Sequence, residues 1–203
     1  ILVGIFVIIM LALAKGGLSG LGDNAFVHKP KSATTPRATP SGTSTTSTMS
    51  PSQSPTGGGE PVSIRTVTSF DPQGDGEEKQ SIADKAADGD PGTDWTSDAY
   101  KSATFSGLKD GVGLRLDLGS DTAVHEVKVT VPRAGTSFQL RSMPGAAQDL
   151  SGSKEIASAA DADGTVTLTL DKPVTTRYLL LWFTKAVQDK DGYRVAVSEV
   201  SVQ

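Results

Sequence analysis

The most concentrated group of acidic side chains lies in a short segment rich in Gly and Pro. Asp88, Asp90 and Asp94 fall within seven residues, and the Gly and Pro residues between them favour a tight turn. Carboxylates and backbone carbonyls gathered in one loop are ligands that suit a hard cation such as calcium. The spacing is not that of an EF-hand, because the later Gly and the bidentate Glu are missing. Asp, Gly and Pro also build turns without a cation, so both interpretations stay open.

A second group of side chains with binding chemistry follows Trp95. Tyr100 and Phe105 offer flat rings that can stack on a sugar, and Lys101 and Lys109 can meet carboxylates or phosphates. The alternative is that both rings cap the edge of the fold, because only 5% of the residues are aromatic and most aromatic side chains belong to a core. The sequence therefore names Tyr100, Lys101, Phe105 and Lys109 as candidate ligand contacts.

The sequence lacks the motifs of several common catalytic sites. It has no Cys and no Gly-x-Ser-x-Gly motif, and its two His residues, His28 and His125, are far apart. His125 shares the alternation of Val127 and Val129, which predicts a partly buried strand residue rather than a general base. We therefore expect a protein that is not an enzyme.

The charge balance argues against binding to nucleic acid. The chain has 19 Lys and Arg against 23 Asp and Glu, and residues 61–203 have 15 against 21, a net charge of −6. Phosphate contacts need clustered cations, and no basic patch is visible.

The elements that must position these residues are mostly strands. Apolar and polar residues alternate over 112–118 and over 127–131, and further short runs follow between Gly, Pro and Asp turns. Residues 177–185 are apolar in both phases, which predicts a central strand buried on both faces. A helical stretch is expected only at 77–87. Residues 61–203 are therefore predicted to form an all-β sandwich or jelly roll.

Two segments of different character precede this domain. Residues 1–14 contain no polar side chain, and we expect residues 1–20 to be part of a transmembrane helix that begins upstream; a signal sequence is the alternative. In residues 31–58, 22 of 28 residues are Ser, Thr, Pro or Gly, which predicts a disordered stalk over 21–60. Its composition fits an O-glycosylated stalk and an unmodified linker equally well.

The motifs of the last domain resemble a known family. Asp88-Gly-Asp-x-x-Thr-x-Trp95, then Leu116-Asp-Leu-Gly119, then the terminal Ser198-Glu-Val200 are similar to the discoidin, or factor 5/8 type C, superfamily of galactose-binding-like jelly rolls. The resemblance implies a structural calcium ion held by Asp90, Thr93 and Glu199, which would clamp the loop to the last strand. It also implies that Trp95 packs in the core beside that loop.

A second resemblance concerns the protein context. The segments 95–100, 107–113 and 138–142, with the strand Leu179-Leu-Leu-Trp-Phe183, are similar to the C-terminal extracytoplasmic domain of actinobacterial membrane proteins. Those proteins carry a cytoplasmic kinase or pseudokinase domain, and some are fused to the lipid II flippase. In them a single span and a polar stalk precede the β domain, which is the order expected here.

Together these observations predict a non-catalytic binding or sensor module. It would be a single-pass membrane protein with its C-terminal domain outside the cytoplasm, and it would recognise an envelope glycan or a peptidoglycan precursor. Its expected partners are that glycan, the membrane and the lipid II flippase. The alternative is a carbohydrate-binding module appended to a secreted cell-wall enzyme.

Overall fold

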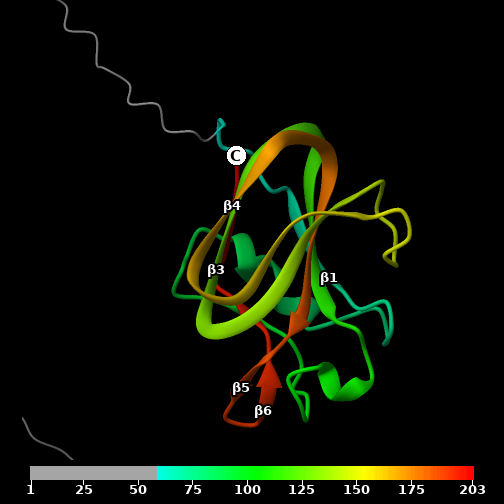
Figure 1. The fold of residues 1–203 in the computed structure, drawn as a ribbon, viewed down its shortest axis with the longest axis vertical. Coiled ribbons are helices and arrows are strands. Elements are labelled where there is room, and N and C mark those ends of the chain that lie inside the picture. Colours follow the sequence, from blue (N-terminus) through cyan, green and yellow to red (C-terminus); the bar gives the residue numbers. More distant parts are fainter. Residues whose placement is uncertain (1–58) are drawn as a thin grey trace, which may run out of the picture. The chain divides into compact units, whose positions relative to one another are not determined.

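The alternating segments of the sequence form the strands of an antiparallel sheet. The computed structural model describes residues 59–203 (Figure 1). Its elements in chain order are β1 (Thr66–Phe70), η1 (Gln80–Ala87), β2 (Trp95–Thr96), η2 (Phe105–Gly107), β3 (Val112–Met143), β4 (Lys154–Lys185), β5 (Val187–Asp189), β6 (Gly192–Arg194), β7 (Ala196–Val197) and β8 (Glu199–Val202). The predicted all-β class is confirmed. The stretch expected to be helical at 77–87 contains the 3-10 helix η1.

The larger layer of the sandwich is built around one segment of β4. Residues 178–183 pair with residues 112–117 of β3 on one side and with residues 138–143 of β3 on the other. β1 pairs with the first of these β3 segments, and residues 154–159 of β4 pair with the second. The predicted central strand at 177–185 is therefore confirmed.

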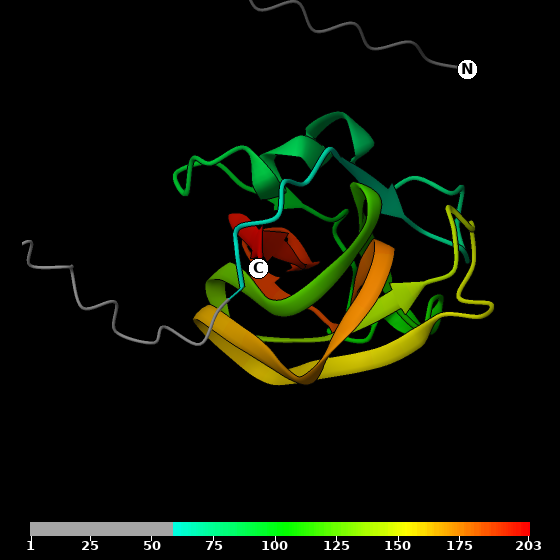
Figure 2. The same ribbon diagram turned by 90° about the horizontal axis from the view of Figure 1, so that it is seen from above.

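The smaller layer is made by the middle parts of the same two strands. Residues 126–131 of β3 pair with residues 164–169 of β4 on one side and with β8 on the other. β3 turns from one layer into the other where its register with β4 breaks, close to Gly119 and Gly135. Both glycines have a left-handed backbone, with φ of 85° and 104°, which a residue with a Cβ adopts at a cost. The two layers are seen from above in Figure 2.

The main core fills the space between the layers. Leu114, Leu140 and Leu181 of the larger layer belong to the same buried cluster as Val129 and Val200 of the smaller one. Trp95 is also fully buried in this cluster, where its ring lies 6.0 Å from that of Phe183, and its Nε1 donates to the Glu78 carbonyl (3.0 Å). The expectation that Trp95 packs in the core is confirmed.

A second apolar cluster covers the outer face of the larger layer. Leu180 and Trp182 alternate along β4 with Leu181 and Phe183, so they point away from the main core. Trp182 packs edge-on against Phe70, with ring centroids 5.9 Å apart. The buried members of this second cluster are Phe70, Met143, Leu180 and Trp182. Burial on both faces explains why this strand is continuously apolar.

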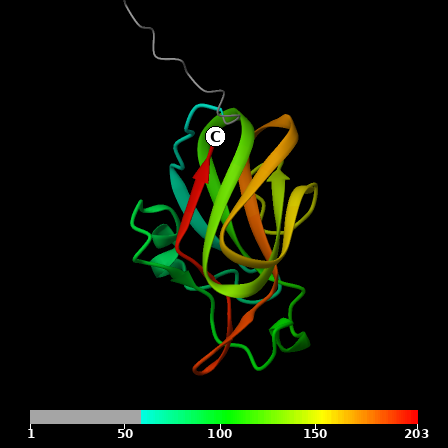
Figure 3. The ribbon, with the colours of Figure 1, turned by 60° about the vertical axis from the view of Figure 1, so that its left-hand side comes forward.

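The first and last described residues lie at one end of the domain, and the β5–β6 hairpin lies at the other. Val62 bridges Val202, and the His125 amide donates to the Gln203 carbonyl (2.6 Å), so the first described residues lie beside the C-terminus. The hairpin of β5 and β6 lies at the end of the body opposite the C-terminus (Figures 1 and 3). The helix η1 packs on β1, β2 and β8.

Within residues 59–203, no helix is long and apolar enough to cross a bilayer. The transmembrane segment predicted at 1–20 lies outside the described residues, as does nearly all of the stalk predicted at 21–60. These assignments and the proposed domain boundaries stay predictions.

An ion pair fastens β3 to β4 near the first corner of the sheet. Arg177 donates through Nε and Nη2 to the two carboxylate oxygens of Asp117 (2.8 and 2.9 Å). These hydrogen bonds, with a further one from the Gly119 amide, lower the pKa of Asp117 from 3.8 to about 2. A carboxyl with a lowered pKa in the folded state contributes stability above its unfolded pKa, and this contribution is lost as the pH falls through the folded value.

We therefore predict that Arg177→Gln destabilises the fold at pH 6 and has little effect at pH 2. In the wild type, the Asp117 contribution disappears over the interval from about pH 4 to about pH 2, as the carboxylate takes up its proton. Denaturant unfolding at both pH values checks this, with the exposed Lys172→Gln as a charge-matched control. An equal loss of stability at the two pH values would contradict the assignment.

Candidate functional site

A buried ion cluster fixes the loop that precedes β3. The Lys109 Nζ donates to Asp71 Oδ2 (2.8 Å), to Glu78 Oε2 (3.2 Å) and to the Tyr100 hydroxyl (3.0 Å). The Tyr100 hydroxyl in turn donates to the Glu78 carboxylate (2.9 Å), and Glu78 also accepts from the Asp98 amide (2.7 Å). Asp71 and Glu78 are 2% and 0% exposed. One lysine therefore holds two buried carboxylates and ties the loop to the segment between β1 and η1.

The pKa shifts of this cluster follow from its burial and its charges. Burial raises the pKa of the Tyr100 hydroxyl, and the negative charge of Glu78 raises it further. Burial by itself would lower the pKa of Lys109, but its hydrogen bonds to Asp71 and Tyr100 and the charge of Glu78 outweigh burial and raise that pKa. Tyr100 is therefore neutral and Lys109 charged at physiological pH.

The backbone of the loop 98–110 is held in a strained turn. Phe105, Ser106 and Gly107 have left-handed φ angles of 53°, 62° and 67°, which are unfavourable for the first two residues. The turn is fixed by the Ser106 amide, which donates to Ser102 Oγ (3.0 Å), and by the Lys101 amide, which donates to Ser106 Oγ (2.8 Å). The fully buried Phe105 side chain anchors it in the core.

The hairpin of β5 and β6 lies on this loop. Tyr100 and Tyr193 exchange two backbone hydrogen bonds of 2.9 and 2.8 Å. Gly192 allows the close approach, since a Cβ there would lie 2.6 Å from the Tyr100 carbonyl oxygen. The Ala186 amide donates to the Ala103 carbonyl just before the hairpin (2.8 Å). The loop thus fixes the position of the hairpin.

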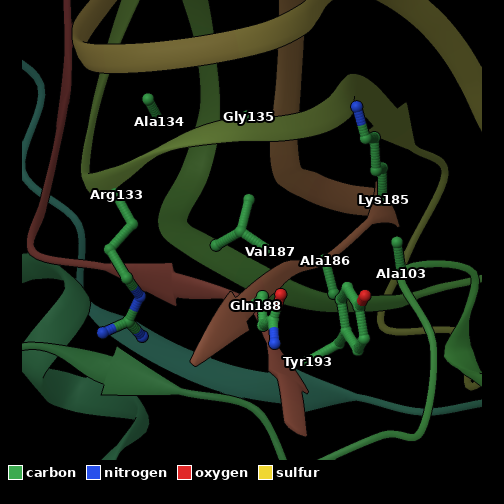
Figure 4. A pocket seen from close by; sticks show the side chains of 9 residues that line it. All are labelled: Ala103, Arg133, Ala134, Gly135, Lys185, Ala186, Val187, Gln188 and Tyr193. Atoms are coloured by element: carbon green, nitrogen blue, oxygen red, sulfur yellow. The ribbon is translucent and has the colours of Figure 1, made fainter. Parts of the chain in front are cut away.

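A groove of about 520 Å³ lies between this hairpin, the loop and the β3 corner at Gly135 (Figure 4). Ala186 and Val187 contribute apolar surface, and the half-buried Tyr193 contributes its ring. Its polar side chains are Arg133, Lys185, Gln188 and Tyr193. The groove therefore combines an apolar surface with hydrogen-bond donors, and we take it as the candidate site.

The cations of the groove are held by carboxylates outside its lining. Asp189 Oδ2 lies 3.5 Å from Arg133 Nη2 and 3.9 Å from Arg194 Nε. The Lys190 amide, which donates to Asp189 (2.8 Å), and the charges of the two arginines lower the pKa of Asp189. Lys185 pairs with Asp161 on the opposite side. Each of the two cations that line the groove therefore has a carboxylate beside it.

The four ligand contacts predicted from the sequence do not line this groove. Tyr100, Lys101 and Lys109 line a separate depression of about 540 Å³, which the exposed Leu108 also lines. The Phe105 side chain is 0% exposed, so it presents no face on which a sugar can stack, and Tyr100 is only 9% exposed. Their rings pack edge to face, 5.1 Å apart. The alternative, that these two rings belong to the fold, holds for both.

Lys109 also has a different role from the predicted one. Its charge is engaged by Asp71 and Glu78, and its side chain is 16% exposed, so it supports the loop and is not a free cation. Lys101 is exposed at the surface of the loop.

The loop that contains the predicted metal residues Asp90 and Thr93 lies against Glu199 of β8. Glu199 Oε2 accepts from the Gly89 amide (3.0 Å), Asp90 Oδ1 from the Gly92 amide (2.9 Å), and Thr93 Oγ1 donates to Asp88 Oδ2 (2.8 Å). Burial and the charges of Asp88 and Asp90 raise the pKa of Glu199, opposed by two backbone hydrogen bonds.

The side chains at this surface would hold a cation only together with backbone carbonyls. Among residues 59–203, no Lys, Arg or His makes an ion pair with Asp88, Asp90 or Glu199, so their negative charge is not neutralised by contact. This surplus of negative charge fits a cation. In the same part of the chain, however, no three or more His, Asp or Glu side chains are grouped as a ready-made metal site. Backbone carbonyls would therefore have to complete the coordination.

Sequence reasoning did not identify the groove. Arg133, Gln188 and Tyr193 are separated by up to 60 positions and share no motif. The available signal was weak: Tyr193 follows the turn Asp189-Lys-Asp-Gly192, and an aromatic side chain in a short exposed hairpin is a candidate contact.

Comparison with known proteins establishes the fold. No family model matches the sequence. The chain is similar to the CBM32 of AlyQ in complex with 4,5-unsaturated mannuronic acid (16% identity, 70% of this chain and 97% of that chain, TM-score 0.51). It is also similar to chitosan-binding module 2, in complex with chitotriose, from the chitosanase/glucanase of Paenibacillus sp. IK-5 (17% identity, 70% and 97%, TM-score 0.52). Residues 59–203 thus share the jelly-roll β-sandwich fold of these modules, and the fold class predicted from the sequence is confirmed.

The buried ion cluster gives a test of what holds the loop. We predict that Lys109→Met lowers the free energy of unfolding by about 3–5 kcal/mol, because it leaves the carboxylates of Asp71 and Glu78 buried without a cation. The matched control is Lys101→Met on the same loop, which removes an exposed charge and should cost less than about 0.5 kcal/mol. Denaturant unfolding at pH 7 measures both, and similar values for the two variants would contradict a supporting role for Lys109.

Proposed function

We propose that residues 59–203 are a non-catalytic module that binds a glycan in the groove beside the β5–β6 hairpin. The observation that carries this proposal is the composition of that groove, in which the Tyr193 ring and the apolar Ala186 and Val187 lie beside Gln188, with Arg133 on the other side of Gln188 (Figure 4). A pyranose ring has an apolar face and a rim of hydroxyls, so it needs both kinds of surface. Likeness to carbohydrate-binding modules of the same fold supports the proposal.

The groove is suited to binding and not to bond cleavage. Its lining residues among 59–203 include no carboxylate and no histidine, so it holds no pair of groups for general acid and base catalysis. The nearby carboxylates of Asp161 and Asp189 are engaged with Lys185, Arg133 and Arg194.

The position of the groove suits a tethered module. The groove lies at the β5–β6 end, and residues 59–62 lie beside the C-terminus at the other end (Figure 3). Because the preceding chain joins the domain at residue 59, the groove is at the end of the domain away from this point of attachment. This geometry fits a domain tethered through its N-terminal end, and we propose that the tether is a stalk that follows a single membrane span, with the domain outside the cytoplasm.

The wider context that we propose is a membrane-anchored regulator of cell-wall synthesis. In this proposal the upstream part is kinase-like, the partners are an envelope glycan or a peptidoglycan precursor and the lipid II flippase, and the protein resides in the cell membrane.

The second candidate function is that of a module appended to a secreted wall enzyme. It is favoured by the likeness to a truncated AlyQ that contains CBM32 and alginate lyase domains (17% identity, 70% of this chain and 32% of that chain, TM-score 0.50).

We also propose a structural calcium ion at the surface between the loop of residues 88–94 and β8. Asp90, Thr93 and Glu199 would hold it together with backbone carbonyls, and it would offset the charge of three neighbouring carboxylates. Its role would be to fasten the loop that follows η1 to the last strand.

Chelation tests the calcium proposal. Because a cation that binds only the folded state stabilises it, removal of calcium with a chelator should lower the thermal unfolding midpoint of the wild type by several degrees. In Glu199→Gln the chelator should cause little change. The isosteric control is Gln203→Glu, which adds a carboxylate at the C-terminus and should respond to the chelator as the wild type does. A wild-type midpoint that does not move on chelation would refute the proposal.

The glycan proposal is tested by removing the ring in the groove. We predict that Tyr193→Ala weakens retention on purified wall polysaccharide by about tenfold or more, because a central aromatic contact is lost while the backbone pairing with Tyr100 remains. Tyr178→Ala removes a half-buried tyrosine that packs on Arg177 outside the groove and should bind as the wild type does. Unchanged retention by a folded Tyr193→Ala protein would place the site elsewhere.

A further inference from the structure

The groove has a surplus of positive charge, although the domain as a whole is acidic. Arg133 and Arg194 share the single carboxylate of Asp189, at 3.5 and 3.9 Å. The other cation that lines the groove, Lys185, is balanced by Asp161. The three cations Arg133, Arg194 and Lys185 and the two carboxylates Asp189 and Asp161 therefore carry a net charge of +1. Residues 61–203 as a whole carry a net charge of −6.

Arg133 is also short of hydrogen-bond acceptors. Its Nε and Nη2 atoms are buried without a hydrogen-bond partner among the described residues, and its contact with Asp189 is longer than a good hydrogen bond. An unpaired buried donor on a charged group is costly, so an added acceptor is favourable. The side chain is 34% exposed, so it can turn its donors toward a ligand in the groove.

The second cation lies on the other side of the groove floor. Figure 4 shows Arg133 and Lys185 on opposite sides of Val187, with the Tyr193 ring on the Lys185 side and lower in the view. The Lys185 and Asp161 side chains are 45% and 68% exposed, so their ion pair contributes little and a ligand carboxylate can replace Asp161.

We infer that the groove binds an acidic oligosaccharide, with a sugar carboxylate at Arg133 and another negative group toward Lys185. This inference rests on the proposed function and specifies its ligand class. A planar guanidinium pairs well with a carboxylate, and the apolar floor between the two cations suits the apolar face of a sugar ring. An amino sugar would bring a positive charge to a groove that already has a surplus of it, so a cationic glycan is disfavoured.

The test compares matched pairs of ligands on the full 203-residue chain. Isothermal titration measures trisaccharides of galacturonic, mannuronic and glucuronic acid, each against its carboxyl-reduced neutral counterpart, with fully deacetylated chitotriose, a trimer of glucosamine, as the cationic sugar. For at least one pair we expect the acid to bind about tenfold or more tightly than the neutral sugar, with the ratio falling as salt is raised. Arg133→Gln should reduce that ratio severalfold, and Lys185→Gln should reduce it less.

The control variant is Arg65→Gln, which makes the same charge change in the segment that precedes β1 and should keep the wild-type ratio. Circular dichroism melting of each variant shows that the fold is retained. Neutral sugars or chitotriose that bind as tightly as the acids in every pair would overturn the inference and leave the glycan-binding proposal intact. No saturable binding of any sugar tested would count against both. An acid preference that survives Arg133→Gln would also overturn the assignment.

Discussion

Two buried carboxylates that share one lysine are the constraint on which the candidate site depends. Asp71 and Glu78 approach Lys109 from the segment between β1 and η1, and Glu78 also binds Tyr100. The cluster ties the loop 98–110 to the segment between β1 and η1, while the serine hydrogen bonds and buried Phe105 hold the left-handed turn within the loop. Tyr100 also makes two backbone hydrogen bonds with Tyr193, so the cluster helps to fix the position of the β5–β6 hairpin. The groove is therefore shaped by charges that lie outside it.

The sandwich supplies the rigid base for that arrangement. The β4 segment 178–183 is buried on both faces, between the main core and the cluster around Trp182. It leads directly into Lys185 and β5, so the hairpin extends from the most constrained strand of the sheet. A groove whose sides are fixed in this way is preorganised, and a ligand loses little binding energy in ordering it.

The parts of this structure that could be predicted are those with a local signal. Period-two alternation located β3 and β4, and a run apolar in both phases identified the central strand. The same alternation failed at His125, which is exposed because the β3 register shifts between Val124 and Glu126. Burial of Phe105, the ion cluster at Lys109 and the groove itself depend on residues distant in the sequence, which periodicity and short motifs do not report.

The most direct test of the account is to locate a bound glycan on the protein. Amide chemical shifts of the isotope-labelled chain can be followed by NMR during titration with an acidic wall oligosaccharide. The account predicts that the largest changes fall on the groove residues Arg133, Val187, Gln188 and Tyr193, with little change around His125 at the opposite end of the domain. Saturable changes centred on another surface, with the groove amides unmoved, would contradict it.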